Sequence, residues 1–506
     1  MMQTPDFFRA RLDGMIDLKH PLAVLATRLR WAQLEADLAP TWQRQSREGV
    51  LGDGGALLPE RGGTMTAAGI SVAGRPRLSI RLLCSLVYLK HAFNLSDEAL
   101  CERWSENVVW QHFSGLDYYE PRLPCDATQI GRFRSNIGEA GMQAILKATI
   151  DTALDVKAIK PAEFERIIVD TTVQEKAISY PVDARLLEIA RHKIVSHAKR
   201  CGMVLRQTFA KEGKTLRRKA GGYAHAKQFK RLARTVKRQR TIVGRLIREV
   251  RGKLEAGAFN AGSSPITFAS LSTLLERADR IRTQQRKDKN KLYALHAPEV
   301  ECISKGKARN RYEFGVKVSL AITHKQGLIV GAKRFTGNPF DGHTLASQIT
   351  QCNALTQRTG RTVKQAFVDL GYRGVDADNP GVAVTHRGRI KSMSKAERKQ
   401  LKRRQAVEPV IGHVKHDHRM LRCHLKGSTG DALHAMACAA GYNIRWLMRV
   451  MLRLGLKGLF ALLTLIALGA AHAGLKWPRH FNWRYSPTVL TYDNVRVDLN
   501  FAGTTK

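Results

Sequence analysis

Acidic residues are scarce in this sequence, and their scarcity sets its charge. The 506 residues include 43 Asp and Glu against 84 Lys and Arg, which gives a formal net charge of +41 at pH 7. An enzyme for small metabolites does not need so strong a positive electrostatic field. A protein that binds along a polyphosphate does, because neutralised phosphates release counterions. The alternatives are a generally basic surface, or association with ribosomes or membranes. We expect a nucleic-acid partner, and DNA above all.

Closely spaced cysteine pairs are also absent. No two of the eight cysteines share a C-x-x-C spacing, since they lie at positions 84, 101, 125, 201, 302, 352, 423 and 438. This pattern argues against a zinc ribbon and against a disulfide framework. We expect reduced and mostly buried thiols.

Export signals are missing too. The N-terminus, MMQTPDFFRARLDG, lacks the basic-then-apolar pattern of a signal peptide. The one long apolar run, Gly458 to Gly474, is slightly short for a membrane-spanning helix and is interrupted by His472. A buried or partner-facing helix, or a poorly selected tail, is favoured over a membrane span. The expected location is the cytoplasm, in association with the nucleoid.

Composition divides the chain into four regions. They are a helical lead-in with a Gly-rich linker (1–75), a compact helical region (76–150), a region of mixed strand and helix patterns (160–450) and an apolar helix with an irregular tail (454–506). No internal repeat is evident.

The second region is predicted to consist of short helices joined by tight turns. Ser96 is placed to cap one helix, and Asp126 or Thr128 to cap another that carries Arg132 and Arg134. Such helices, the last one basic, suit a helix-turn-helix-like module that reads DNA. A plain helical packing domain is the alternative, and the sequence leaves both open.

The third region predicts an α/β fold. Apolar and β-branched runs predict strands at 166–169, 312–322, 328–335, 363–368 and 382–385, with a hairpin between the second and the third. Helical patterns occupy 183–290, 341–356, 395–416 and 431–452. Between Arg191 and Arg251 there are 20 Lys and Arg against two acids, a difference of +18 over 61 residues. Apolar residues such as Phe229 and Ile242 recur among these charges, so helices with one buried face are predicted.

Three acidic residues stand out by their local settings. Asp170 ends the apolar run 167–169, Asp369 ends the run 366–368, and each is followed by a predicted turn. Glu408 lies in the basic helical segment. Taken singly, a strand-end Asp is more often a turn or cap residue than a ligand. Together, three hard oxygen donors can hold Mg²⁺ ions that activate a water or a sugar 3′-hydroxyl against a phosphodiester.

The spacing around Glu408 adds a further pattern. Arg404 lies four residues before it and Lys415 seven after, so a helix would place all three roughly on one face. Pro409 weakens this interpretation unless a new helix begins there. These three residues could form an ordinary row of salt bridges. Alternatively, Glu408 could be a metal ligand flanked by cations that bind phosphates.

The motif Arg404-x3-Glu408-x6-Lys415 resembles the Y-x2-R-x3-E-x6-K motif of bacterial insertion-sequence transposases with a DDE triad. The surrounding sequence is most similar to the "insertion sequence five" group, in stretches that include RLPCDATQIGRFR (122–134), VDTTVQEKAISYPVDARLLE (169–188), FVDLGYRG (367–374) and RRQAVEPVIGHVKHDHRMLRCHLKG (403–427). The resemblance covers about residues 75 to 450.

This resemblance implies a ribonuclease-H-like catalytic domain, interrupted by a long basic helical insertion at about 185–295. It implies that Asp170, Asp369 and Glu408 bind two Mg²⁺ ions, for which Mn²⁺ would also serve. The implied reactions are hydrolytic cleavage at the element ends and strand transfer into target DNA by the freed 3′-hydroxyl. The N-terminal helical module would recognise the terminal inverted repeats. A homodimer or higher assembly is expected because two ends must be cut together.

The resemblance also implies DNA contacts. The expected contact residues are Arg404, Lys415, Tyr372, Arg373, Arg132 and Arg134. The family's Tyr, three residues before Arg404, is Leu401 here, and leucine can neither donate a hydrogen bond nor stack as an aromatic ring. Either that contact is dispensable or Tyr372 substitutes for it.

Histidines near these motifs have two interpretations each. His343, in Asn338-Pro-Phe-Asp-Gly-His, could lie near the active site, but a turn with Asp341 as helix cap is favoured. The cluster of His413, His416 and His418 resembles a metal site, but basic surface residues near DNA are favoured.

Two other functions remain as alternatives to an active transposase. One is a catalytically inactive or domesticated sequence-specific DNA-binding protein, for which Leu401 and the apolar tail speak. The other is a structure-selective nuclease on the same fold, which would cut branched DNA without specific ends.

Overall fold

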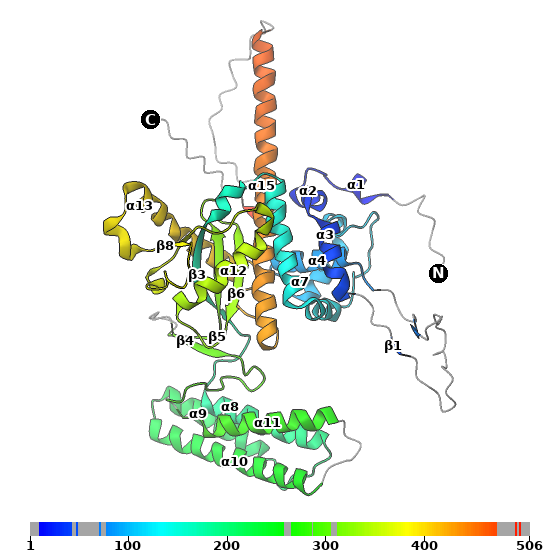
Figure 1. The fold of residues 1–506 in the computed structure, drawn as a ribbon. Helices are drawn as coiled ribbons and strands as arrows, with labels where there is room; N and C mark the ends of the chain where they lie inside the picture. Colours follow the sequence, from blue (N-terminus) through cyan, green and yellow to red (C-terminus); the bar gives the residue numbers. More distant parts are fainter. Residues whose placement is uncertain are drawn as a thin grey trace.

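The computed structural model describes residues 10–42, 77–257, 265–285, 287–304 and 311–472, together with four two-residue strands: β1 (Arg47–Glu48), β2 (Ile70–Ser71), β9 (Thr491–Tyr492) and β10 (Val495–Arg496). Of residues 265–267 and 456–472 it describes the helical backbone alone. Most of the predicted Gly-rich linker and of the predicted irregular tail lies outside the described residues. Figure 1 shows helices on one side, a sheet on the other, the long helix α15 between them, and a separate group of helices, drawn in green at the bottom.

The N-terminal part is entirely helical. Its helices are α1 (Leu12–Met15), α2 (Pro21–Arg28), α3 (Trp31–Trp42), α4 (Ile80–Ala92), α5 (Asp97–Glu106), α6 (Val108–Phe113) and α7 (Ala127–Asp155). The predicted caps at Ser96 and Asp126 are confirmed, because Ser96 Oγ accepts a hydrogen bond from the Ala99 N–H at 3.1 Å and Asp126 Oδ1 one from the Thr128 N–H at 2.8 Å. A cap of this kind satisfies a backbone donor that a helix start leaves open.

A mixed sheet forms the centre of the α/β part. Its strands are β3 (Arg166–Glu175), β4 (Glu301–Ser304), β5 (Tyr312–Thr323), β6 (Ile329–Phe335), β7 (Gln365–Phe367) and β8 (Ala383–Thr385). The strand order is β4-β5-β3-β7-β8, and β6 also pairs with β5. β5 runs antiparallel to β3 and β6, while β7 is parallel to both β3 and β8. The predicted hairpin is thereby confirmed as β5 and β6.

The first strand differs from its prediction. The sequence predicts that it ends at Val169, with a turn at Thr171, but β3 continues to Glu175 and pairs with β5 along nine residues. The β-branched residues Thr171, Thr172 and Val173 favour an extended backbone, and they pack well on a pleated sheet. Asp170 is consequently a mid-strand residue.

Short helices complete this part. They are η2 (Pro161–Glu165), η3 (Asp341–Thr344), α12 (Leu345–Leu355), η4 (Gln357–Thr359), η5 (Leu370–Tyr372), η6 (Arg387–Ser392), α13 (Lys395–Lys402), η7 (Arg403–Ala406) and α14 (Val407–His416). α14 begins at Val407, so Pro409 falls in its first turn, where the missing N–H breaks no helical hydrogen bond. α15 runs from Gly427 to His472 and is longer than the predicted helix 431–452.

Four helices lie between β3 and β4 in the sequence. They are α8 (Asp183–Arg200), α9 (Ala210–His225), α10 (Phe229–Glu255) and α11 (Pro265–Thr283). Ile194, Leu246 and Leu275 belong to a hydrophobic core that these helices share among themselves and not with the sheet. The predicted buried face of the basic segment is confirmed at Ile242, but Phe229 is 66% exposed.

The N-terminal helices and the sheet share one hydrophobic core, and α15 joins them. The buried Asn443 of α15 accepts a hydrogen bond from the Ile329 N–H at 3.0 Å and donates to the Ile329 carbonyl at 2.9 Å and to Thr149 Oγ1 at 3.0 Å. One side chain thus bonds to α15's neighbours β6 and α7.

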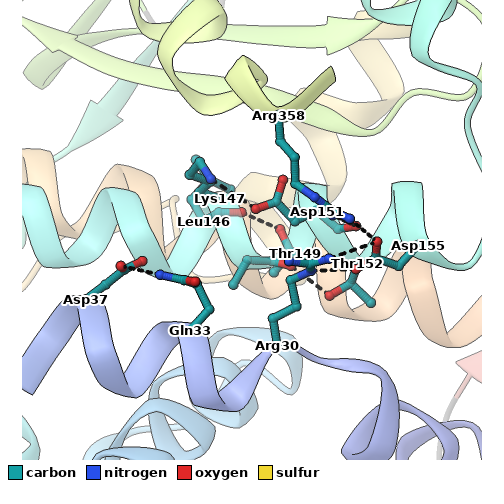
Figure 2. A network of polar contacts seen from close by, with 11 residues as sticks. Arg30, Gln33, Asp37, Leu146, Lys147, Thr149, Asp151, Thr152, Asp155 and Arg358 are labelled. Atoms are coloured by element: carbon teal, nitrogen blue, oxygen red, sulfur yellow. Dashed lines mark hydrogen bonds and ion pairs between the residues drawn. The ribbon is translucent and has the colours of Figure 1, made fainter. Parts of the chain in front are cut away.

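A polar network at the end of α7 adds a second connection (Figure 2). Asp155 lies between Arg30, whose Nε donates at 2.6 Å, and Arg358 of η4. Burial alone would raise the pKa of Asp155, but the hydrogen bonds from both arginines outweigh it and lower that pKa. The pairing fixes the N-terminal helices against the α/β part.

The eight cysteines are all free thiols, six of them buried, which confirms the expectation from their spacing. Among the helices of the described residues, none has an apolar stretch long enough to cross a membrane.

Candidate active site

Asp170 lies in the middle of β3, and the backbone of that strand binds its carboxylate. Its side chain is 16% exposed, and its Oδ1 accepts a hydrogen bond from the Thr171 N–H at 2.8 Å. Directly across the sheet it pairs with Leu320 of β5. A ligand on a central strand is positioned more accurately than one on a loop.

Asp369 follows the neighbouring parallel strand. Ile168 of β3 pairs with Phe367 of β7, and each Asp lies two residues beyond its member of this pair. Neighbouring strands lie about 5 Å apart, and residues two apart point to the same face. Asp369 then caps η5, because its Oδ1 accepts from the Gly371 N–H at 2.8 Å. The predicted sequence of strand, Asp and turn is confirmed here.

Asp341 is a further carboxylate at this place, and sequence reasoning missed it. The predicted cap role is wrong, since Phe340 occupies the cap position of η3 and makes no side-chain cap bond. Asp341 Oδ1 instead accepts hydrogen bonds from Thr171 Oγ1 at 2.9 Å and from Lys317 Nζ at 2.8 Å. An Asp after an Asn-Pro turn looks the same in sequence whether it caps a helix or faces a site.

Gly371 separates two of these carboxylates. A Cβ at this glycine would lie 3.0 Å from Asp369 Oδ1 and 3.3 Å from Asp341 Oδ2. A side chain here would therefore press on both oxygens, and glycine avoids this contact. Asp341 and Asp369 therefore lie beside the same glycine.

Tyr372 has a buried phenol whose pKa is affected by the aspartates. Its ring is fully buried, and burial raises the pKa of its phenol well above the usual range. The charges of Asp170, Asp341 and Asp369 raise that pKa further, because a phenolate would be repelled by all three. The charges of all three carboxylates therefore act on one phenol.

Glu408 lies on α14, outside the sheet, and its side chain is 65% exposed. Arg404 lies between it and the sheet: Nη2 is 3.4 Å from Asp170 Oδ2, and Nη1 is 3.9 Å from Glu408 Oε1. The guanidinium thus contacts the two carboxylates that a shared cation would contact. The predicted common face of Arg404 and Glu408 is confirmed by this i, i+4 pair.

The donor set at this place consists of carboxylate oxygens, which suits a hard cation such as Mg²⁺ or Mn²⁺. Within the described residues, the oxygens of Asp170, Asp369 and Glu408 do not all lie within 4.8 Å of one another. The two aspartates are fixed by adjoining strands, and Glu408 is linked to Asp170 through Arg404.

Comparison with known families decides the relationship. Residues 63–136 match the family model described as "Transposase domain (DUF772)", and residues 378–448 match the model described as "Transposase DDE domain". The chain belongs to the insertion-sequence DDE transposases. The DDE-domain match includes Glu408 but begins after Asp170 and Asp369, so the case for these two aspartates is their geometry.

A curated relative of this transposase is "Uncharacterized protein ORF8 in nfe locus" of Rhizobium meliloti. It is 37% identical over 224 residues, which are 44% of this chain and 95% of the relative. No solved structure matches the transposase.

The two arginines expected to contact DNA in the N-terminal part of the transposase differ in their exposure. Arg132 is exposed, whereas Arg134 is 4% exposed and donates to both oxygens of Asp97, at 2.9 and 2.8 Å. Lys90 pairs with the same Asp97 at 2.8 Å. Buried in this cluster, Arg134 has no DNA-facing surface in this structure.

The remaining predicted contacts of the transposase also divide by exposure. Arg373 is exposed and Lys415 is half-buried, whereas Tyr372 is fully buried. Leu401, which replaces the family's Tyr, is 5% exposed and lies in the main core. Neither Leu401 nor Tyr372 is placed to touch a DNA backbone here, so Tyr372 does not substitute for the missing contact.

The histidines of the transposase differ in their exposure. His343 is exposed, with its ring against Phe340 at a centroid distance of 5.6 Å. His413 and His416 are exposed, but His418 is buried and donates from Nδ1 to the His91 carbonyl at 2.8 Å. The prediction that all three of the later histidines lie on the surface is therefore wrong for His418.

Proposed function

We propose that this transposase binds the terminal inverted repeats of its element, cleaves the element ends and joins them to target DNA. The observation that carries the proposal is that Asp170 lies on β3 and Asp369 follows the adjoining parallel strand β7, with Arg404 linking Asp170 to Glu408. Carboxylates gathered at a rigid sheet in a chain of net charge +41 suit phosphodiester chemistry on DNA.

The fold we propose for the catalytic part is ribonuclease-H-like. The strand order supports it, with a central β3 flanked by the antiparallel β5 and the parallel β7. The proposed catalytic domain spans 160–450, and the proposed helical insertion at about 185–295 corresponds to α8–α11. The separate core of these four helices supports their interpretation as an insertion.

Asp170, Asp369 and Glu408 would hold two Mg²⁺ ions, or Mn²⁺. Bound there, the metals would activate the attacking water or 3′-hydroxyl and stabilise the leaving 3′-oxygen. Asp341 would support the same place, because Thr171 and Lys317 fix its Oδ1 and leave Oδ2 beside Gly371.

The chain's own residues orient and balance this site. β3 and β7 set the spacing of the two aspartates, and Lys317 offsets part of the negative charge through Asp341. Arg404 neutralises the repulsion between Asp170 and Glu408 before DNA binds. Glu408 is the most exposed carboxylate of the three, so it meets the substrate directly.

DNA would be held by exposed cations around the site and by those of α9 and α10. Arg373 lies four residues beyond Asp369, and Arg132 lies on α7. On α9 and α10, Arg217, Arg218 and Lys230 are exposed, and Phe229, which precedes Lys230, offers an exposed ring for stacking on a base.

Single substitutions test the proposed triad. Asp170→Asn, Asp369→Asn and Glu408→Gln should each lower Mg²⁺-dependent end cleavage about a thousandfold or more, since several kcal/mol of charge stabilisation are lost. Binding to labelled element ends should survive in all three. Asp378→Asn, which changes an exposed acid nine residues beyond Asp369 in the chain, is the matched control and should cleave normally. Full cleavage by any of the three variants would remove that residue from the triad.

The same assay separates the alternatives. A catalytically inactive DNA-binding protein would bind the ends tightly and show no strand transfer with Mg²⁺. A structure-selective nuclease would cut branched DNA equally well when unrelated ends compete. Cleavage that is confined to the element's own ends supports a transposase.

A further inference from the structure

A second group of ligand-type side chains lies far from the carboxylates, at the contact of α4 with α15. His91 is near the end of α4, and His434 and Cys438 lie one turn apart on α15. One donor atom from each residue lies within 4.8 Å of the others, and all three side chains are buried. No other group of His, Cys, Asp or Glu in the described part of the chain meets this distance.

The separation of two donors in this group matches a tetrahedral zinc site. His91 Nδ1 and Cys438 Sγ are 3.5 Å apart. Zn–N and Zn–S bonds of about 2.0–2.1 and 2.3 Å, at a tetrahedral angle, place the two donors about 3.6 Å apart. The spacing of these two atoms is therefore that of two ligands of one zinc ion.

The neighbouring backbone orients the histidines as ligands. His434 Nε2 must donate its proton to the Arg419 carbonyl, 2.9 Å away, because a carbonyl only accepts. The lone pair of a neutral His434 is therefore on Nδ1. His418, which follows α14, donates from Nδ1 to the His91 carbonyl and so attaches that segment to α4 beside the group. Ligating histidines commonly donate their other N–H to a carbonyl in this way.

The charges around the group bear on which ion fits. Three cations lie around the group: Lys90 precedes His91 in the chain, Arg134 shares Asp97 with Lys90, and Arg419 offers its carbonyl to His434. These cations oppose an added positive charge, and Asp97 balances part of them. Release of the Cys438 thiol proton on binding would offset one further unit of charge.

We infer that His91, His434 and Cys438 form a structural zinc site that fastens the N-terminal helices to α15. The donors are two nitrogens and one sulfur, which suit Zn²⁺ and do not suit Mg²⁺. On binding, the Cys438 S–H bond breaks, its proton goes to solvent, and a Zn–S bond forms. A small donor such as water takes the fourth position. The site is separate from the carboxylates and does not depend on the proposed function.

The metal content of the purified full chain is the first test. Protein from zinc-containing medium should carry one zinc per chain by elemental analysis. Cys438→Ala and His434→Gln should lose it, whereas Cys84→Ala, which changes another fully buried thiol on α4, should keep it. Asp369→Asn should also keep it, which separates this site from the carboxylates.

Cobalt serves as the spectroscopic probe. Protein refolded with Co²⁺ should show a thiolate-to-cobalt charge-transfer band and strong visible bands of a tetrahedral ion, and both should vanish in Cys438→Ser. Cobalt held by carboxylates gives neither. An absence of zinc together with an absence of the charge-transfer band in the refolded wild type would overturn the inference, and the group would then be a hydrogen-bonded His–Cys pair. A charge-transfer band that persists in Cys438→Ser would overturn it equally.

A stability measurement covers variants that fail to fold. Wild-type protein refolded with zinc should melt at a higher temperature than the same protein refolded with a chelator, and Cys84→Ala should show the same difference. Equal melting temperatures with and without zinc would contradict a structural role.

Discussion

The two helical regions of this transposase are built differently. The N-terminal helices share one hydrophobic core with the sheet, through α15, and are fastened to it by Asn443 and by Asp155. The helices α8–α11 are more basic, and they have a core of their own. A change in the first region should therefore reach the catalytic sheet, whereas a change in the second should stay local.

The largest effect is expected at Arg134, inside the first region. Arg134→Ala leaves Asp97 without its bidentate partner in a buried cluster, and breaking such a pair lowers the free energy of unfolding by about 3–5 kcal/mol. Chemical denaturation should show this loss in one transition with the sheet. Arg132→Ala, two residues away and exposed, should leave stability unchanged and weaken binding to DNA. A stable Arg134→Ala with reduced DNA binding would restore its role as a contact.

The next effect separates the two cores. Leu246→Ala removes a fully buried side chain from the α8–α11 core and should destabilise these helices by about 2–5 kcal/mol. Hydrogen exchange should accelerate in α8, α10 and α11, while α4 and α7 keep their protection. Equal acceleration in α4 and α7 would show that the two regions unfold together.

A pH-dependent effect is expected at Asp97. Burial opposes its charge, but the hydrogen bond from Arg134 and the attraction of Lys90 outweigh this and lower the pKa of Asp97 to about 2, from 3.8. The resulting stabilisation is complete above pH 4 and is lost as the pH falls through 2. Between these limits the wild type should lose about 2 kcal/mol more than Asp97→Asn in acid denaturation.

The ion pair of Glu212 and Arg238 in the second region should not show this dependence of stability on pH. Glu212 and Arg238 are about 40% exposed, so solvent screens their ion pair. Glu212→Gln should change the acid profile hardly at all. A drop as large as that for Asp97 would contradict the contrast between the regions.

The smallest effect on stability, and a clear one on DNA, is expected on α9. Arg217→Gln with Arg218→Gln changes two exposed cations, so the free energy of unfolding should change by less than about 0.5 kcal/mol. The slope of log binding constant against log salt should fall by about 0.9 for each DNA phosphate that the variant no longer neutralises. Lys19→Gln with Arg28→Gln, on exposed positions of the first region, is the control. Equal slopes for both double variants would argue against α9 as a DNA surface.

Local patterns in the sequence predict much of this structure. The hairpin β5–β6, the caps at Ser96 and Asp126, and the i, i+4 pair of Arg404 and Glu408 all depend on neighbouring residues, and all are present. The extension of β3 past Asp170 has a local signal only in the β-branched Thr171, Thr172 and Val173, and partners from β5 decide how far that strand pairs.

Long-range contacts account for what the sequence does not reveal. Asp341 faces the aspartates because Thr171 and Lys317 bind it, 170 and 24 residues away. The burial of Arg134 depends on Asp97 in another helix, and that of His418 on His91. Residue type and spacing along the chain carry no signal of such pairings.

The placement of the carboxylates has a consequence for movement. Asp170 belongs to β3, and Asp369 lies two residues beyond the end of the directly paired strand β7, so the strand pairing limits how far the two residues can move apart. Glu408 belongs to α14, which is not a strand of that sheet, and it reaches Asp170 through a single side chain, Arg404. The position of Glu408 relative to the two aspartates therefore depends on the packing of α14 and on Arg404, and not on strand pairing. We expect a DNA phosphate to compete with Asp170 for the Arg404 guanidinium, so Glu408 is the carboxylate whose position DNA binding should change.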